Sequence, residues 1–193
     1  MYKRQPEWHE HQYCLIAWPC NKDLYGKIIN KARDEVANVI NEIAKTEHVI
    51  VLSNKEDINE IQNKTDHKNI DIVECKLDDS WMRDIAPIFY NEDEKLKSIS
   101  FEFNGYGKYP DYLNDNKISK FISNYLNIPT KISDLVIEGG AITYDDKKNL
   151  FSTKNVIFNK NRKQKHNSEY IIKELKLLFC LLYTSPSPRD RSL

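Results

Sequence analysis

The sequence lacks an excess of charge of either sign. It contains 29 lysine and arginine residues and 29 aspartate and glutamate residues, so its formal net charge is zero. Proteins that bind nucleic acid or membrane surfaces in a general way usually carry a basic excess or a basic stripe. We therefore expect no nucleic acid and no membrane among the partners of this chain.

Long apolar runs and paired cysteines are also missing. No apolar run approaches the roughly 20 residues that a membrane-spanning helix needs, and the N-terminus lacks the basic-then-apolar pattern of a secretion signal. The sequence contains no G-x-x-x-x-G-K nucleotide loop and no cluster of metal ligands. No C-x-x-C spacing, which would suggest a zinc site or a redox pair, occurs among Cys14, Cys20, Cys75 and Cys180. These absences predict reduced thiols, no metal site and a cytoplasmic protein.

Charged side chains are concentrated in residues 78–87, which read DDSWMRDIAP. This stretch packs three aspartates, an arginine and a tryptophan directly before an apolar run. So many charged groups are costly to bury unless they form ion pairs, bind a ligand or take part in a functional site. Pro87 favours extended geometry in the residue before it, so we expect a loop that leads straight into a strand. Asp84 would then lie at a loop–strand junction, where a rigid backbone can aim a carboxylate into a cleft.

Hydrophobic periodicity predicts an α/β fold in the first part of the chain. The predicted strands are 12–19, 48–52 and 70–74, and the predicted helices between them are 24–44 and 56–61. The apolar face expected for the long helix consists of Ile28, Ile29, Ala32, Val36, Val39, Ile40 and Ile43. An alternation of strands and helices is typical of α/β packing.

The pattern then recurs in the second part of the chain. We expect strands at 88–90, 98–103, 131–137 and 149–158, a surface loop at 104–110, and helices at 117–126 and 168–178. The last helix is expected to turn Ile171, Ile172, Leu175 and Leu178 inward. Two units therefore share the order helix, strand, charged loop, hairpin. Because loops that leave one end of successive strands converge, we expect Asp84 and Glu138 to face one cleft.

The character of the sequence changes at about Leu181. The last residues contain two prolines and no apolar period, and they interrupt a helix in the middle of its pattern. We interpret residues 181–193 as a non-native or disordered tail, and residues 6–180 as the N-terminal part of a domain. This interpretation predicts that the chain is a fragment of a longer protein.

Four motifs follow one another along almost the whole chain. They are Pro6-Glu7-Trp8 with Ala17-Trp18-Pro19, the run DSWMRD at 79–84 with Pro87, the run FNGYGKYP at 103–110, and Glu138-Gly139-Gly140. With these motifs the chain resembles the agmatine deiminases and bacterial peptidyl-arginine deiminases, a family of guanidine-modifying enzymes. The run NKNR at 159–162 resembles the Asn-x-Asn-Arg of that family. The chain departs from the family at Ile85-Ala86, where Thr-Gly or Asn-Gly is common, and at Tyr106, where Trp is usual.

The resemblance implies a fold and a chemistry. The fold is a five-bladed α/β propeller, or pentein, of which this chain holds a part. The chemistry is hydrolysis of agmatine to N-carbamoylputrescine and ammonia, as in putrescine biosynthesis, through a cysteine thiouronium intermediate and without a cofactor. Asp84 would clamp the guanidinium, and Glu138 would contact the substrate or orient the catalytic histidine. Trp81 would stack on the guanidinium or wall the pocket.

Each of these assignments has a purely structural alternative. Asp84 could pair with Arg83 or cap a turn. Glu138 could be an ordinary loop acid beside two glycines that the backbone requires. Trp81 could serve core or rim packing instead of ligand stacking. Arg83 itself we interpret as a structural ion-pair partner.

The residues that break the carbon–nitrogen bond are not found in this sequence. The family carries a histidine and an aspartate in a Gly-His-x-Asp run and the nucleophile in a His-Cys-x-Thr run, and neither run occurs here. We therefore expect the chain as written to be inactive. The alternatives to an agmatine deiminase are a peptidyl-arginine deiminase, a non-catalytic module that binds guanidinium or polyamines, and a passive α/β fragment. The sequence leaves the oligomeric state open.

Overall fold

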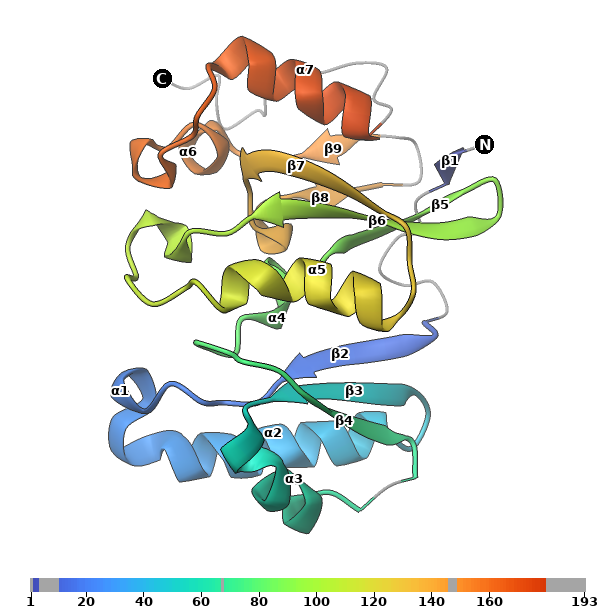
Figure 1. Ribbon diagram of the computed structural model, residues 1–193, viewed down its shortest axis with the longest axis vertical. Coiled ribbons are helices and arrows are strands. Elements are labelled where there is room, and N and C mark those ends of the chain that lie inside the picture. The colour runs from blue at the N-terminus through green and yellow to red at the C-terminus, as the bar shows by residue number, and fades with distance from the viewer. Residues whose placement is uncertain (1, 4–10, 67, 146–148, 180–193) are drawn as a thin grey trace. The chain divides into compact units, whose positions relative to one another are not determined.

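The computed structural model describes residues 2–3, 11–66, 68–145 and 149–179 (Figure 1). The chain divides into two compact units. The N-terminal unit consists of residues 10–82 and 113–115, and the C-terminal unit consists of residues 1–9, 83–112 and 116–193. The tail expected at 181–193 lies outside the described residues, and the domain bounds 6–180 stay a prediction.

The N-terminal unit is built on a parallel sheet of three strands. In spatial order the strands are β2 (Tyr13–Ala17), β3 (His48–Ser53) and β4 (Ile70–Glu74). The helices are α1 (Lys22–Tyr25), η1 (Gly26–Ile28), α2 (Ile29–Ile43), η2 (Lys55–Asp57) and α3 (Ile58–Lys64). Ile40 of α2 and Ile61 of α3 pack with Val49 and Val51 of the central strand. The sequence predicted all three strands, and β3 is buried as its continuous apolar run indicates.

The long helix of this unit differs from the expectation. The predicted segment 24–44 is divided into α1, η1 and α2, and Gly26 ends the first piece with a φ of +52°. Ile28 and Val39, both expected on the buried face, are 62% and 51% exposed. Arg33 is buried instead, because its Nη2 lies 2.8 Å from Oδ1 of Asp57 and its Nε donates to the Pro19 carbonyl at 2.9 Å. An apolar pattern cannot predict that a charged residue occupies the core, since its burial depends on partners elsewhere in the chain.

The C-terminal unit contains a mixed sheet and a small hairpin. The sheet has the order β1 (Tyr2–Lys3), β5 (Ile88–Glu92), β6 (Lys95–Glu102), β7 (Thr130–Val136), and the hairpin pairs β8 (Thr143–Tyr144) with β9 (Leu150–Phe151). The remaining elements are α4 (Met82–Ile85), η3 (Gly105–Gly107), α5 (Asp115–Tyr125), η4 (Gly139–Ala141), α6 (Lys154–Ile157), η5 (Lys160–Arg162) and α7 (Ser168–Phe179). β5 and β6 are antiparallel, whereas β6 and β7 are parallel.

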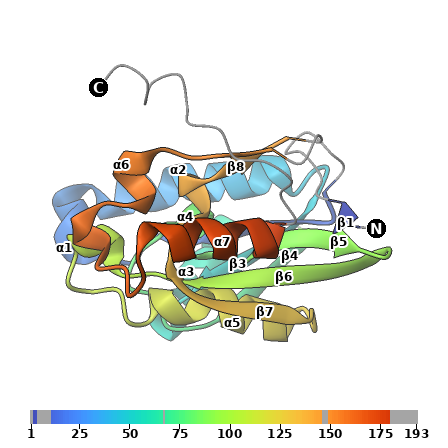
Figure 2. The same ribbon diagram turned by 90° about the horizontal axis from the view of Figure 1, so that it is seen from above.

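The two long helices of this unit cover opposite faces of β6 (Figure 2). Phe101 of β6 stacks on Phe179 of α7, with ring centroids 6.1 Å apart. Ser98, which points to the other face, brings its hydroxyl to 2.9 Å from that of Ser123 on α5. β6 is thus buried on both sides, and it carries the chain directly towards η3.

Two predictions for this unit are wrong in detail. The strand expected at 149–158 is the short strand β9 followed by the helical turn α6. A short apolar run such as Val156 to Phe158 does not distinguish strand from helix. Ile172 is 38% exposed, whereas Ile171, Leu175 and Leu178 are buried as expected. The buried three recur at spacings of four and three, so Ile172 lies on a different side of α7.

The fold class predicted from the sequence is confirmed, since both units combine strands and helices. The strands that the structure describes form three sheets and do not by themselves display a propeller. Among the described helices, none has the length and apolar character that a membrane span requires.

Candidate active site

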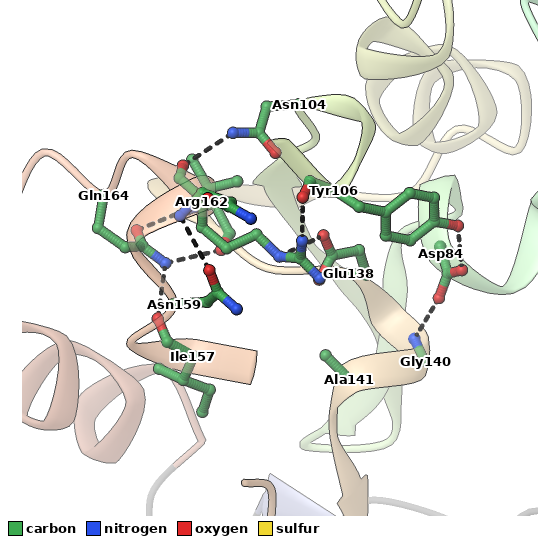
Figure 3. Close-up of polar contacts among 12 residues, drawn as sticks. Asp84, Asn104, Tyr106, Glu138, Gly140, Ala141, Ile157, Asn159, Arg162 and Gln164 are labelled. Atoms are coloured by element: carbon green, nitrogen blue, oxygen red, sulfur yellow. Dashed lines mark hydrogen bonds and ion pairs between the residues drawn. The ribbon is translucent and has the colours of Figure 1, made fainter. Parts of the chain in front are cut away.

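Asp84 and the segment after β7 meet in the C-terminal unit (Figure 3). Asp84 lies just before the chain enters β5, as the sequence predicts, but in the single helical turn α4 instead of the expected loop. Its Oδ1 accepts a hydrogen bond of 2.9 Å from the backbone N–H of Gly140. Glu138 precedes this contact by two residues. The structure therefore brings together the two motifs that carry the predicted carboxylates, although they are more than fifty residues apart in the chain.

The two glycines of Glu138-Gly139-Gly140 allow this close approach. A Cβ atom at position 139 would lie under 3.0 Å from the carbonyl oxygen of Arg83, and a Cβ at position 140 would lie under 3.0 Å from Oδ1 of Asp84. Real Cβ atoms essentially never come so close to such atoms. The paired glycines are therefore required for packing against α4: a side chain at position 139 would displace the Arg83 backbone, and one at position 140 would displace the Asp84 carboxylate.

Tyr106 provides the second contact of Asp84. Its hydroxyl donates to Oδ2 of Asp84 at 2.6 Å, so each carboxylate oxygen accepts one hydrogen bond. The backbone at Tyr106 has a φ of +60°, a left-handed conformation that is uncommon for an aromatic residue. Phe103 and Tyr109 contact its ring edge-to-face, with centroids 5.2 and 6.1 Å away. These contacts hold the ring in the orientation that delivers its hydroxyl to Asp84.

The glycines that flank Tyr106 are needed for the same turn. Gly105 and Gly107 have φ values of +61° and +67°. A Cβ at position 107 would overlap the carbonyl oxygen of Asn161, which lies in η5. The loop with Tyr106 is thus pressed against η5, and only glycine permits this contact.

Glu138 is buried and lies beside a cation. Its exposed fraction is 3%, and its Oε1 lies 2.9 Å from Nε of Arg162. Among the described residues neither atom has a partner with hydrogen-bond geometry, so the contact is an ion pair without a directed hydrogen bond. Burial raises the pKa of Glu138 above its ordinary value; the charge of Arg162 opposes this shift, and the carboxylate of Asp84 adds to it.

Arg162 links Glu138 to the loop that carries Tyr106. It donates from Nη1 to the backbone carbonyl of Tyr106, and its guanidinium carbon lies 5.4 Å from the centre of the Tyr106 ring. The backbone carbonyl of Arg162 accepts a hydrogen bond of 2.8 Å from Nδ2 of Asn104. Arg162 therefore binds both Glu138 and the loop that positions Asp84. The sequence identified the NKNR run but not these contacts, and nothing in it indicates that the arginine pairs with Glu138.

Gln164 was also missed by the sequence analysis. Its side-chain amide accepts from the backbone N–H of Val136 at 3.0 Å and donates to the carbonyl of Val136 at 2.7 Å. It thereby pairs with the last residue of β7 as a neighbouring strand would. This contact fixes the chain two residues before Glu138.

Trp81, the third predicted site residue, belongs to the N-terminal unit. Its side chain is 38% exposed, and its indole Nε1 donates to Oδ2 of Asp79 at 2.8 Å. Asp79 itself is 6% exposed. The structure thus fixes the orientation of the indole through a buried carboxylate, while Asp84 and Glu138 meet in the other unit.

The described cysteines are poor nucleophiles. Burial, followed by the nearby carboxylates of which Asp115 is the strongest, raises the pKa of Cys20 to about 12. Burial likewise raises the pKa of Cys75 to about 11, and it raises that of Cys14. Since the thiolate is the reactive form, none of the three is suited to attack a substrate at neutral pH. Cys180 lies outside the described residues.

Comparison with known proteins identifies the family of the chain. The family described as the Porphyromonas-type peptidyl-arginine deiminases matches residues 3–182, which is nearly the whole chain. The chain belongs to this family. The relationship expected from the four motifs is thereby confirmed.

Individual relatives have names that point to one branch of the family. A protein of Mycoplasma capricolum subsp. capricolum, named as a candidate agmatine deiminase, is 33% identical over 88% of this chain and 48% of its own length. The agmatine deiminase of Medicago truncatula is 30% identical over 88% of this chain and 49% of its own length. The chain spans about half the length of the curated relatives that it matches.

Solved structures share the fold. The agmatine deiminase of Enterococcus faecalis has a TM-score of 0.86 with 18% identity, over 93% of this chain and 51% of that one. A Cys-to-Ser variant of the C. jejuni agmatine deiminase with substrate bound has a TM-score of 0.83 with 25% identity, over 94% of this chain and 54% of that one. This similarity agrees with the predicted fold class, part of the propeller that the resemblance implies.

Proposed function

We propose that this chain provides the guanidinium-holding part of an agmatine deiminase-like hydrolase. The observation that carries the proposal is the hydrogen bond from Gly140 to Asp84, because it joins the two motifs that resemble the substrate site of the family. The names of the relatives support agmatine as the substrate, with N-carbamoylputrescine and ammonia as products. In this role the protein would contribute to putrescine biosynthesis.

Asp84 is suited to clamp a planar cation. Tyr106 and Gly140 each donate to a different oxygen, so the plane of the carboxylate is fixed. A carboxylate oxygen can accept two hydrogen bonds, which leaves one acceptor position on each oxygen for a guanidinium. Bidentate pairing of this kind fixes the orientation of the cation as well as its binding energy.

Glu138 and Trp81 are the two further residues proposed to contact the substrate. Glu138 would contact the substrate or orient the catalytic histidine, and its ion pair with Arg162 supports a fixed position for either role. Trp81 would stack on the guanidinium or wall the pocket, with its indole held by Asp79. We further propose residues 6–180 as the N-terminal part of one deiminase-like domain, in a cytoplasmic protein without nucleic-acid or membrane partners.

The reaction itself requires groups that this sequence does not contain. A cysteine thiolate adds to the guanidinium carbon, the carbon–nitrogen bond to the leaving group breaks, and that nitrogen departs with an added proton as ammonia. Water then adds to the thiouronium carbon, and the carbon–sulfur bond of this adduct breaks, which releases the thiolate and the urea product. The sequence holds no Gly-His-x-Asp or His-Cys-x-Thr run, and the described thiols have raised pKa values. We therefore propose that the 193-residue chain binds agmatine without turning it over.

An assay of ammonia release tests this proposal. The purified chain, incubated with millimolar agmatine at pH 7–8, is expected to release no more ammonia than a buffer blank. Steady release that scales with protein concentration would overturn the proposed inactivity.

Peptidyl-arginine is the second candidate substrate, and the description of the matching family favours it. Both substrates present a guanidinium, so the Asp84 clamp alone does not discriminate between them. Turnover of free agmatine against an arginine-containing peptide, compared on a clone that continues beyond this chain, would separate the two. Preference for the peptide would contradict the agmatine proposal.

A further inference from the structure

Two aspartates of the N-terminal unit cap each other's backbone. Oδ2 of Asp78 accepts from the N–H of Asn114 at 2.7 Å and from that of Asp115 at 3.3 Å, and Oδ1 accepts from the Asn114 side chain at 2.7 Å. In return, Oδ1 of Asp115 accepts from the N–H of Asp78 at 2.8 Å and from that of Asp79 at 3.4 Å. These reciprocal hydrogen bonds, which we call the aspartate clasp, join the loop after β4 to the start of α5.

Asp79 connects the aspartate clasp to Trp81 by hydrogen bonds. Asp79 is held by Asp115 through its backbone, and its own carboxylate accepts from the N–H of Ser80 at 2.7 Å and from the Trp81 indole at 2.8 Å. Both Asp79 and Asp115 are buried, with exposed fractions of 6% and 1%. A shift of Asp115 would therefore move the backbone that carries the acceptor of the indole.

We propose that Asp115 is a positioning residue for Trp81 and acts through Asp79. The proposal deepens the proposed function, because it rests on that function for the role of Trp81 at the substrate. It adds a control of Trp81 by a residue that lies outside the four motifs and accepts a hydrogen bond from the Asp79 backbone.

The clasp is expected to depend on pH near neutrality. Burial raises the pKa of Asp115 from 3.8 to about 7; the carboxylates of Asp78 and Asp79 add to this shift, and their backbone N–H groups oppose it. Among the described residues, Cys20 and Cys75 also lie within the electrostatic reach of Asp115, and their thiols stay neutral at pH 7.

The sign of the effect follows from the raised pKa. The closed clasp binds a proton more tightly than an opened loop would, so the clasp is most stable below the ordinary pKa of an aspartate. Its stability is lost as the pH rises from about 4 to about 7, and it does not change further above that range. Trp81 is therefore held most firmly on the acid side of neutrality.

Amide hydrogen exchange on the uniformly ¹⁵N-labelled chain tests the proposal without any ligand. The probes are the backbone amides of Asp78 and Asp79 and the indole N–H of Trp81, whose signal is identified by its absence in Trp81→Phe. After correction for intrinsic exchange, the opening equilibrium at these sites is expected to rise roughly 50-fold between pH 5 and pH 7. A constant opening equilibrium over this range would overturn the pH dependence.

Two substitutions of Asp115 separate positioning from general stability. Asp115→Asn keeps an oxygen acceptor and cannot ionise, so protection of all three probes is expected to persist with the pH dependence removed. Asp115→Ala removes the acceptor, so the Trp81 indole signal is expected to shift and to lose protection at every pH. An unchanged indole in Asp115→Ala, or the wild-type pH dependence in Asp115→Asn, would overturn the proposal. Asp115→Asn keeps the test decisive if the alanine variant does not fold, and failure to bind agmatine would not affect either result.

Discussion

Tyr106 shows how one hydroxyl can determine the geometry of a carboxylate, here that of Asp84. The resemblance to the family leads us to expect Trp at this position, and Tyr106 instead brings an O–H to 2.6 Å from Oδ2 of Asp84. Together with the Gly140 N–H, this hydroxyl fixes both oxygens of the clamp. The orientation of Asp84 in this chain thus depends on a residue that sequence analysis noted only as an exception.

Removal of this hydroxyl should weaken the binding of agmatine. Hydrogen bonds to charged groups contribute about 1.5–3 kcal/mol, so Tyr106→Phe is expected to raise the dissociation constant by roughly ten-fold or more. Tyr109→Phe is the matched control, because Tyr109 packs on the same ring at 6.1 Å. Calorimetric titration of both variants checks this prediction, and equal affinities would contradict it.

The thiols provide a second test at the scale of single residues. The pKa of Cys20 is raised to about 12 and that of Cys75 to about 11, so both should resist iodoacetamide at pH 7 in the folded chain. Mass spectrometry after timed alkylation should show slow modification of both residues, and fast modification once urea unfolds the chain. If Cys20 in the folded chain reacted at the rate of a free thiol, its pKa would not be raised, which would contradict this prediction.

At the scale of elements, the tight approach of η3 to η5 defines the site. Gly107 faces the carbonyl oxygen of Asn161, and Arg162 of the same short helix reaches both Glu138 and Tyr106. The site is therefore assembled from four short segments, namely α4, η3, residues 138–141 and η5. None of these segments is itself a β-strand. Their geometry depends on glycines and on buried polar contacts.

Two glycines separate the cost of backbone conformation from the cost of close packing. Gly26 and Gly107 both have positive φ, at +52° and +67°, but a Cβ at Gly26 meets nothing within 4 Å, whereas one at Gly107 overlaps Asn161. Gly26, with a ψ of −130°, lies in a sparsely populated backbone region, so Gly26→Ala should cost about 1–3 kcal/mol of unfolding free energy. Gly107→Ala should cost at least about 2 kcal/mol more, because its Cβ also overlaps Asn161. Urea unfolding of the two variants measures the difference, and similar midpoints would argue against the packing of η3 on η5.

The elements also show what the sequence can and cannot predict. Most strands and the helices α2, α5 and α7 were predictable, because their apolar residues recur with a fixed period or, in β3, form a continuous run. The turn α6 was not, since four residues carry too little periodicity to separate helix from strand. The burial of Arg33 and the pairing of Arg162 with Glu138 were not predictable either, because each depends on a partner that folding brings from far along the chain. Asp84 and Glu138 were accessible through their motifs, and Tyr106 only through its departure from one.

At the scale of the whole molecule, the proposed function separates substrate binding from bond breaking. The chain spans about half the length of the curated relatives that it matches. Its motifs include the carboxylates proposed to hold the guanidinium, and its sequence lacks the runs that would supply the acid–base and nucleophilic groups. Binding of agmatine without release of ammonia is the behaviour that this division predicts.

The most direct test observes the Asp84 clamp while agmatine binds. The backbone N–H of Gly140 donates to Asp84, so its signal in a ¹H–¹⁵N spectrum reports on the carboxylate. Agmatine is expected to shift this signal saturably, with a dissociation constant of about a millimolar or tighter. Putrescine, which lacks the guanidinium, and the variant Asp84→Asn should each abolish the shift. No change at Gly140, or an equal change with putrescine, would contradict the proposal that this site holds a guanidinium.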